Sequence, residues 1–361
     1  MKQNNFDDKI NLGKQFGLFS GLLLLFSASI SLVFIAYLIF LMLNQPPNPA
    51  LIRTESKPYS GGFVQNTKSD SYSNLWKAPE ISSLPEGENA ELIKYGKDLI
   101  VNTSRYFGPK GTLSAGATNG LNCQNCHLQA GTAAFGNNYG AVAATYPQVR
   151  PRSEKPEDIP FRINDCFERS LNGKALALNS KEMKAIVAYM EWLGKDVPKG
   201  KAPEGSGLIK LAYMNRAADP QKGKLVYENQ CARCHGSMGE GKIFPDGISY
   251  EYPPLWGDKA YNVSAGLFRL EKMARFLKAN MPYGVTYEKP TLSDEEAWDV
   301  AAFINSMPHP MKKFPQDWPN LLTKAIDVPF GPYADGFSEE QHKYGPYHPI
   351  VEKIKTLKKK K

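Results

Sequence analysis

Two short strings decide the fold of this 361-residue chain, namely Cys123-Gln124-Asn125-Cys126-His127 and Cys231-Ala232-Arg233-Cys234-His235. Each has the pattern Cys-x-x-Cys-His, in which two thiols attach a haem covalently and the histidine is an axial iron ligand. A zinc site or a disulfide framework would use the same residue types. Zinc would require further ligands, and only three other histidines exist, all in the C-terminal region. We therefore predict two covalently bound haem c groups.

The sequence around each string repeats the same order of elements. An opening stretch with helical spacing precedes each string, and a second such stretch follows it, starting after Ser180 in one block and Ser293 in the other. Both serines are predicted helix N-caps, and Ser293 with Glu296 forms a capping box. We predict an all-α fold with two tandem class I cytochrome c-like domains, residues 90–200 and residues 206–308.

Residues 18–43 are 26 consecutive residues without a charged side chain. About 20 apolar residues span a bilayer, whereas a signal peptide has roughly 7 to 15 and then a small-residue cleavage site. No such site follows here. We predict a cytoplasmic N-terminus (1–17), one uncleaved transmembrane helix (18–43) and a flexible linker (44–89). The alternative is a soluble periplasmic protein formed by signal cleavage.

The net charge of +8 is concentrated at one end of the chain. The last nine residues contain six lysines, and the rest has 38 Lys and Arg against 36 Asp and Glu. A basic face for nucleic acid is therefore not indicated, and we predict no nucleic-acid partner. Residues 309–361 are predicted to form a C-terminal extension of loops and short helices that ends in the lysine-rich tail.

The second axial ligand determines what each haem does. In the second block, Met281 lies 46 residues after His235 and just before the last predicted helix. A methionine in such a loop is a common second ligand and raises the reduction potential. Met273 falls in a helical apolar pattern and is predicted to pack in the core. We predict that His235 and Met281 ligate the second iron.

The first block has neither a methionine nor a second histidine between His127 and the helix at Ser180. Cys166, 39 residues after His127, is the only thiol outside the two strings. A lone cysteine is often a small buried apolar residue, but a thiolate is also an iron ligand. We predict that Asn164 or Asp165 caps a helix whose first turn contains Cys166, where the helix dipole favours a thiolate.

The chain resembles the thiosulfate dehydrogenase family of dihaem cytochromes, which interconvert thiosulfate and tetrathionate. The resemblance covers roughly residues 75–349 and rests mainly on the string Arg162-Ile163-Asn164-Asp165-Cys166-Phe167-Glu168-Arg169-Ser170-Leu171-Asn172-Gly173-Lys174. Supporting strings are Tyr252-Pro253-Pro254-Leu255-Trp256-Gly257, Ala279-Asn280-Met281-Pro282 and Glu296-Ala297-Trp298-Asp299-Val300-Ala301-Ala302. Some relatives have a lysine at the position of Asn280, and many are soluble.

The resemblance implies roles for individual residues. The active haem would be attached by Cys123 and Cys126 and ligated by His127 and Cys166, with Cys166 also as the catalytic sulfur acceptor. The electron-exit haem would be attached by Cys231 and Cys234 and ligated by His235 and Met281. Substrate anions would be bound by Arg152, Arg162, Ser170 and Lys174. The expected setting is the periplasmic side of the bacterial inner membrane, with a soluble or membrane-bound cytochrome c as electron partner.

Three alternatives use the same motifs. A pure electron-transfer dihaem cytochrome would leave Cys166 as a core residue. A thiosulfate-conjugating sulfur-oxidation cytochrome also uses a cysteine-ligated haem but passes sulfur to a carrier protein. A dihaem peroxidase needs a ligand-free iron and distal acid–base residues, for which the sequence offers no candidates.

Overall fold

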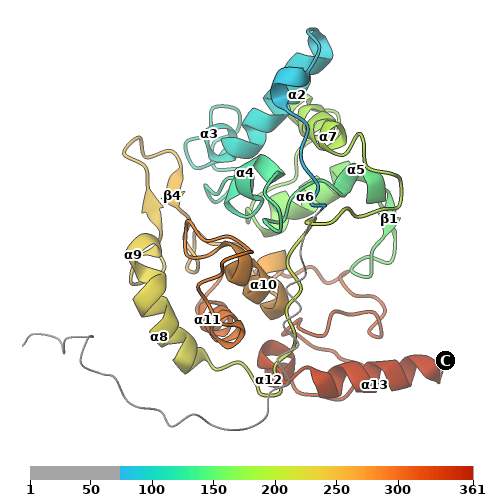
Figure 1. Cartoon of the computed structure of the whole chain (residues 1–361), viewed down its shortest axis with the longest axis vertical. Coiled ribbons are helices and arrows are strands. Elements are labelled where there is room, and N and C mark those ends of the chain that lie inside the picture. Colours follow the sequence, from blue (N-terminus) through green and yellow to red (C-terminus); the bar gives the residue numbers. More distant parts are fainter. Residues whose placement is uncertain (1–73, 361) are drawn as a thin grey trace, which may run out of the picture. The chain divides into compact units, whose positions relative to one another are not determined.

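Each half of the described chain is built on a pair of crossed helices. The computed structural model describes residues 74–360. In the first half, α2 (Glu88–Val101) crosses α7 (Lys181–Leu193), and in the second, α8 (Pro220–Gln230) crosses α11 (Asp294–Ser306) (Figure 1). The two pairs occupy corresponding places in the predicted repeat, since each consists of the helix before a Cys-x-x-Cys-His string and the helix that closes the block.

A glycine allows each crossing to be close. A Cβ atom at Gly96 would lie 2.0 Å from the carbonyl oxygen of Ala185, and one at Gly223 would lie 1.9 Å from that of Asp299. Both distances are far below van der Waals contact, so any side chain at these positions would force the two helices apart. The same close approach at the same place in both halves supports an internal repeat.

The closing helices begin where their caps predict. The Ser180 side chain accepts from the Met183 amide, and Ser293 forms a complete capping box with Glu296. Within residues 74–360, four short antiparallel strands accompany the helices, so this part of the chain is mostly helical and not all-α as predicted. The first half also contains η2 (Ile81–Ser83), α3 (Thr103–Phe107), η3 (Cys123–Asn125), α4 (Leu128–Gly131), α5 (Val142–Thr145), β1 (Gln148–Val149), β2 (Pro156–Glu157) and α6 (Ile159–Arg169). The second half adds α9 (Ala232–His235), β3 (Lys242–Ile243), β4 (Tyr250–Tyr252), η4 (Gly266–Phe268), α10 (Leu270–Asn280), α12 (Glu339–Tyr344) and α13 (His348–Lys359).

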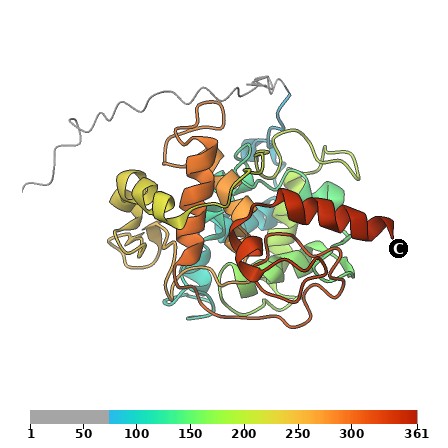
Figure 2. The ribbon, with the colours of Figure 1, turned by 90° about the horizontal axis from the view of Figure 1, so that it is seen from below.

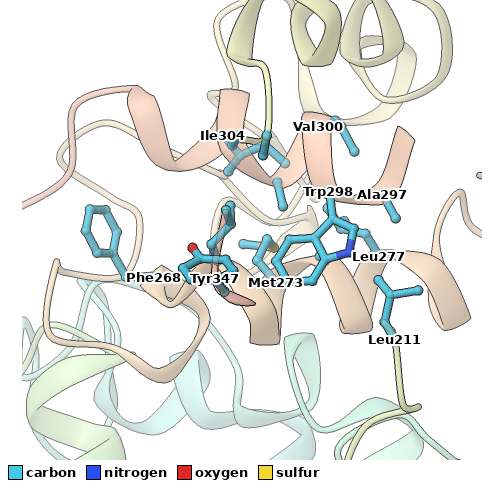
Figure 3. Close-up of a cluster of buried hydrophobic side chains, with 14 of the residues drawn as sticks. Leu211, Phe268, Met273, Leu277, Ala297, Trp298, Val300, Ile304 and Tyr347 are labelled. Atoms are coloured by element: carbon cyan, nitrogen blue, oxygen red, sulfur yellow. The ribbon is translucent and has the colours of Figure 1, made fainter. Parts of the chain in front are cut away.

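The core of the second half includes part of the C-terminal extension. Trp298 of α11 is buried beside Met273 of α10, and Tyr347 from the extension packs against the Trp298 ring (Figure 3). The Trp298 indole donates a hydrogen bond to the carbonyl of Ala212 at 3.0 Å. Met273 is therefore a core residue, as its helical spacing predicts.

The lysine-rich tail is helical as far as Lys359, in contrast to the loops and short helices predicted for the extension. Helix α13 runs from His348 to Lys359 and is the last helix of the chain (Figure 2). Ile350 and Ile354 occupy one side of this helix and are buried in the second core. Apolar residues four apart form a continuous stripe along the helix. Packing of this stripe on the core therefore stabilises a helix whose many lysines repel one another.

The N-terminal predictions fall mostly outside the described residues. The cytoplasmic segment 1–17, the transmembrane helix 18–43 and most of the linker belong to residues 1–73. Within residues 74–360, no helix is both long and apolar enough to cross a membrane. The end of the predicted flexible linker is packed instead: the Trp76 amide donates to the Glu204 carbonyl at 2.9 Å, and the Trp76 ring fills the space beside Gly140.

Candidate functional site

The first Cys-x-x-Cys-His string borders a cavity in the first half of the chain. Cys123, Cys126 and His127 line it on one side, together with apolar residues of α2 and α7. Cys166 and Arg162 of α6 also line the cavity. An apolar pocket with two thiols and a histidine is the environment that a covalently attached haem requires.

His127 is prepared to ligate a metal through one nitrogen. Its Nδ1 atom lies 2.5 Å from the carbonyl oxygen of Asn137, and its ring stacks on Tyr139 with centroids 4.5 Å apart. Burial lowers the pKa of His127 to about 4, so the imidazole is neutral. A neutral ring that donates from Nδ1 has its Nε2 lone pair available to iron. These residues therefore fit a haem in this cavity.

The second string has the same arrangement around its histidine. Nδ1 of His235 lies 2.7 Å from the carbonyl oxygen of Pro253, and burial lowers the pKa of His235. Nε2 is again the available ligand atom. Met281 directly follows α10 as its C-cap residue and packs half-buried against the second core. The half therefore contains all the residue types of a His/Met-ligated haem.

Cys166 does not lie in the first turn of its helix, so the prediction that Asn164 or Asp165 is the N-cap is wrong. Helix α6 begins earlier, because the Asp158 side chain accepts from the Phe161 amide and Pro160 occupies the first turn. Cys166 is therefore near the C-terminal end of α6, where the helix dipole does not favour a thiolate.

A guanidinium group takes the place of the helix dipole. Nη1 of Arg162 lies 3.0 Å from Sγ of Cys166, one turn away on the same helix. Attraction to the Cys166 sulfur is the main cause that raises the pKa of Arg162 above its ordinary value. A fixed positive charge at hydrogen-bond distance stabilises the thiolate form of a cysteine. Ser170, four residues after Cys166, lines the same cavity.

The structure does not bring all four predicted anion-binding residues together. Arg162 and Ser170 line the cavity, whereas Arg152 and Lys174 do not. Arg152 is largely buried, and its Nη1 donates to the Ser264 carbonyl at 3.0 Å and to Asp317 at 3.1 Å. Burial lowers the pKa of Arg152 to about 10. The Lys174 side chain is exposed.

Sequence reasoning missed a buried carboxylate in α6. Asp165 was considered as a helix N-cap, but it is 8% exposed and contacts the guanidinium groups of Arg162 and Arg169. The signal is the spacing of these three residues, which lie three and four positions apart and therefore share one helix face. Asp317 completes the group by binding Arg169 from the C-terminal extension.

Asn280 joins the Met281 segment to the first half of the chain. Its side-chain amide donates to the carbonyl of Phe135 at 3.1 Å and to that of Phe276 at 3.0 Å. Asn280 therefore has a structural use at the position where some relatives have a lysine. Phe135 lies two residues before Asn137, whose carbonyl faces His127. The loop beside His127 is therefore in contact with the segment that contains Met281.

Two protein-family models match the chain, one in each half. The model described as SoxA/TsdA, cytochrome c domain, matches residues 114–198. The model described as cytochrome C oxidase, cbb3-type, subunit III, matches residues 218–304. The mostly helical chain therefore contains two cytochrome c-like domains, and domains of this kind carry covalently bound haem c.

Similar proteins match more than half of this chain. Thiosulfate dehydrogenase from Psychrobacter arcticus is 39% identical over 247 residues, which is 68% of this chain and 72% of that protein. Thiosulfate dehydrogenase from Allochromatium vinosum is 37% identical over 208 residues, 56% of this chain and 74% of that protein. The solved thiosulfate dehydrogenase (TsdBA) from Marichromatium purpuratum, in its as-isolated form, is 31% identical with a TM-score of 0.59. That likeness covers 64% of this chain and 49% of the solved chain, so this chain matches about half of the solved one.

Proposed function

We propose that this chain, which belongs to the thiosulfate dehydrogenase family, is an oxidoreductase that interconverts thiosulfate and tetrathionate at Cys166. One observation carries the proposal for this chain: the only thiol outside the haem strings lines the same cavity as Cys123, Cys126 and His127, with a guanidinium 3.0 Å from its sulfur. A purely structural cysteine needs no such charge beside it.

The chain is proposed to hold two haem c groups of unequal ligation. The first is attached by Cys123 and Cys126, with His127 and Cys166 as axial ligands. The second has a different ligand set, in which the histidine of the second string is paired with a methionine: Cys231, Cys234, His235 and Met281. Because a thiolate donates more charge to iron than a thioether does, the first haem has the lower reduction potential.

The reaction joins two thiosulfate dianions in two steps, both of which take place at the Cys166 sulfur. The thiolate and the sulfane sulfur of thiosulfate form an S–S bond with the release of two electrons. The product is an adduct in which Sγ of Cys166 is bonded to the sulfane sulfur, Cys166 Sγ–S–SO₃⁻. The sulfane sulfur of a second thiosulfate attacks the sulfur bound to Cys166, so that tetrathionate leaves and the thiolate is restored. No proton is taken up or released. When bound, the haem groups supply the one-electron acceptors.

Arg162 and Ser170 are the proposed contacts for the sulfonate group of the substrate. Both line the cavity beside Cys166. A guanidinium binds sulfonate-type oxygens with paired donors and offsets the repulsion between anions. Arg152 and Lys174 do not line the cavity, so the proposed anion site is limited to the first two residues.

We also propose that the electrons pass from the second haem to a soluble or membrane-bound cytochrome c. The proposed location is the periplasmic side of the inner membrane, with residues 18–43 as the anchor. The apolar length of that segment and the haem strings support this location. Cell fractionation and N-terminal sequencing test it, since a mature N-terminus beyond Asn44 would exclude the anchor.

Two assays of the purified holoprotein test the activity. Thiosulfate oxidation is followed with an artificial electron acceptor, and tetrathionate reduction with a reduced dye. Turnover in either assay supports the proposal. The absence of turnover in both, with two haems attached per chain, favours the pure electron-transfer cytochrome. Transfer of sulfur to a carrier protein instead of tetrathionate formation would favour the conjugating enzyme.

A further inference from the structure

The geometry assigns Asp317 of the C-terminal extension a positioning role for the Arg162 guanidinium at Cys166, exerted through Arg169 and Asp165. The inference rests on the proposed function, because that function makes Cys166 the reacting thiol. It extends the active site to a segment that lies about 150 residues further along the chain.

The relay starts with a two-point contact. Oδ2 of Asp317 accepts from Nη1 of Arg169 at 2.7 Å, and Oδ1 accepts from Nη2 at 2.8 Å. The Phe314 ring covers the same guanidinium, with its centroid 3.7 Å from the central carbon. Both terminal nitrogens of Arg169 therefore donate to Asp317, while Nε faces a second carboxylate, that of Asp165.

The Nε contact sets the orientation of the Asp165 carboxylate. Nε of Arg169 donates to Oδ1 of Asp165. Oδ2 is left for Nη1 of Arg162 at 3.3 Å and Nη1 of Arg150 at 3.4 Å. Burial acts to raise the pKa of Asp165, but the surrounding guanidinium groups outweigh it, so the carboxyl stays ionised.

Asp165 holds Arg162 by one long contact, through Oδ2. Because the Oδ1 side of the carboxylate is turned toward Nε of Arg169, Asp165 does not form a two-point pair with Arg162. The same Nη1 atom of Arg162 remains 3.0 Å from Sγ of Cys166. Guanidinium has five N–H donors in a fork, so its other donors stay available to a substrate anion.

The charges of the cluster do not cancel. Its ion pairs connect four guanidinium groups with three carboxylates, namely Arg150, Arg152, Arg162 and Arg169 with Glu157, Asp165 and Asp317. One positive charge is in excess. Because Arg162 is the member beside the Cys166 sulfur, the excess charge lies where a thiolate and an anionic substrate need it.

The extension is itself attached around α6. The ammonium group of Lys312 donates to the carbonyl of Gly173 at 2.8 Å, and Gly173 lies just after α6. The amide of Trp318 donates to the carbonyl of Arg152 at 2.7 Å. Asp317 is therefore held on both sides, so its two carboxylate oxygens present a fixed acceptor pair to Arg169.

Loss of the Asp317 charge should release this arrangement. Arg169 would no longer be held by both terminal nitrogens, and Asp165 could form a two-point pair with Arg162. Arg162 would then leave the Cys166 sulfur, the thiolate would donate more charge to iron, and the reduction potential of that haem would fall. Simple removal of a nearby negative charge has the opposite effect, because it raises the potential. The sign therefore separates the two explanations.

The test uses holoprotein with Asp317→Asn and with Asp317→Glu, which keeps the carboxylate. The control is Asp299→Asn, since Asp299 also binds an arginine through both oxygens, at 2.8 Å each to Arg216, but belongs to the second half. Redox titration gives the potential of each haem, and steady-state assays give kcat and KM. We expect a lower potential for the Cys166-ligated haem and a kcat at least tenfold lower in Asp317→Asn. Asp317→Glu should recover both in part, and Asp299→Asn should change neither.

An unchanged or raised potential in Asp317→Asn would overturn the inference. A fall in kcat shared equally by Asp299→Asn would also overturn it, because general destabilisation then explains the loss. Failure of the proposed function is distinguishable, since wild-type protein would then turn over neither thiosulfate nor tetrathionate.

Discussion

Nη1 of Arg162 lies 3.0 Å from Sγ of Cys166, one helical turn away. Both residues line the cavity beside the first Cys-x-x-Cys-His string. The two side chains face the same space because residues four apart share a helix face. This contact places a positive charge beside the only thiol that is not part of a haem string. Under the proposed function, the same guanidinium also binds the anionic substrate.

Cys166→Met should abolish activity without loss of the fold. Methionine keeps a sulfur ligand for iron but cannot form the covalent adduct, so both haems remain and the first potential rises. Tetrathionate treatment should add a thiol-reversible mass to the Cys166 peptide of wild-type protein only. Retention of even a tenth of normal turnover, a loss of about 1.4 kcal/mol in transition-state stabilisation, would exclude covalent chemistry at this residue.

Arg162→Gln should lower kcat/KM for thiosulfate by about 100-fold, the usual cost of removing a positioned charged donor. Glutamine keeps a hydrogen-bond donor but loses the charge beside the Cys166 sulfur, so the potential of that haem should also fall. Arg105→Gln is the matched control, because Arg105 is an exposed arginine on α3. Equal losses in the two variants would contradict a specific role for Arg162.

Met281→Gly should affect the second haem alone. Loss of the thioether ligand lowers the potential of that haem and removes the far-red absorption band of sulfur–iron ligation. Electron exit slows, so turnover falls while thiosulfate binding is retained. Met273→Leu is the control, since Met273 is buried in the core. A spectrum that changes in the control and not in Met281→Gly would reassign the ligand.

Gly223→Ala should destabilise the second half by about 1–3 kcal/mol, the usual range for overpacking. The added methyl group would lie 1.9 Å from the carbonyl oxygen of Asp299, so α8 and α11 must separate. Thermal unfolding of the holoprotein measures the effect. In the control Gly266→Ala, the methyl group meets open space, and the stability should stay within about 0.5 kcal/mol of wild type. Equal melting temperatures for the two variants would mean that the crossing is not close.

Local features of this protein could be predicted from the sequence because neighbouring residues determine them. The two Cys-x-x-Cys-His strings require only their own spacing, and the capping box of Ser293 and Glu296 requires four consecutive residues. The start of α6 was missed although its signal is local, since Asp158 followed by Pro160 is itself a helix start. The choice of Asn164 or Asp165 placed the cap too close to Cys166.

Only the tertiary structure decides which distant charges meet. Asp317 and Arg169 are 148 residues apart, and no sequence periodicity connects them. They nevertheless form a two-point contact at the C-terminal end of α6. Arg152 and Arg162 look equivalent in the sequence, but one binds Asp317 and the other faces Cys166. The sequence by itself determined the two Cys-x-x-Cys-His strings and the helical repeat, because these depend on short spacings. Packing decided which guanidinium lines the cavity beside Cys166, because ion pairing depends on distance in space.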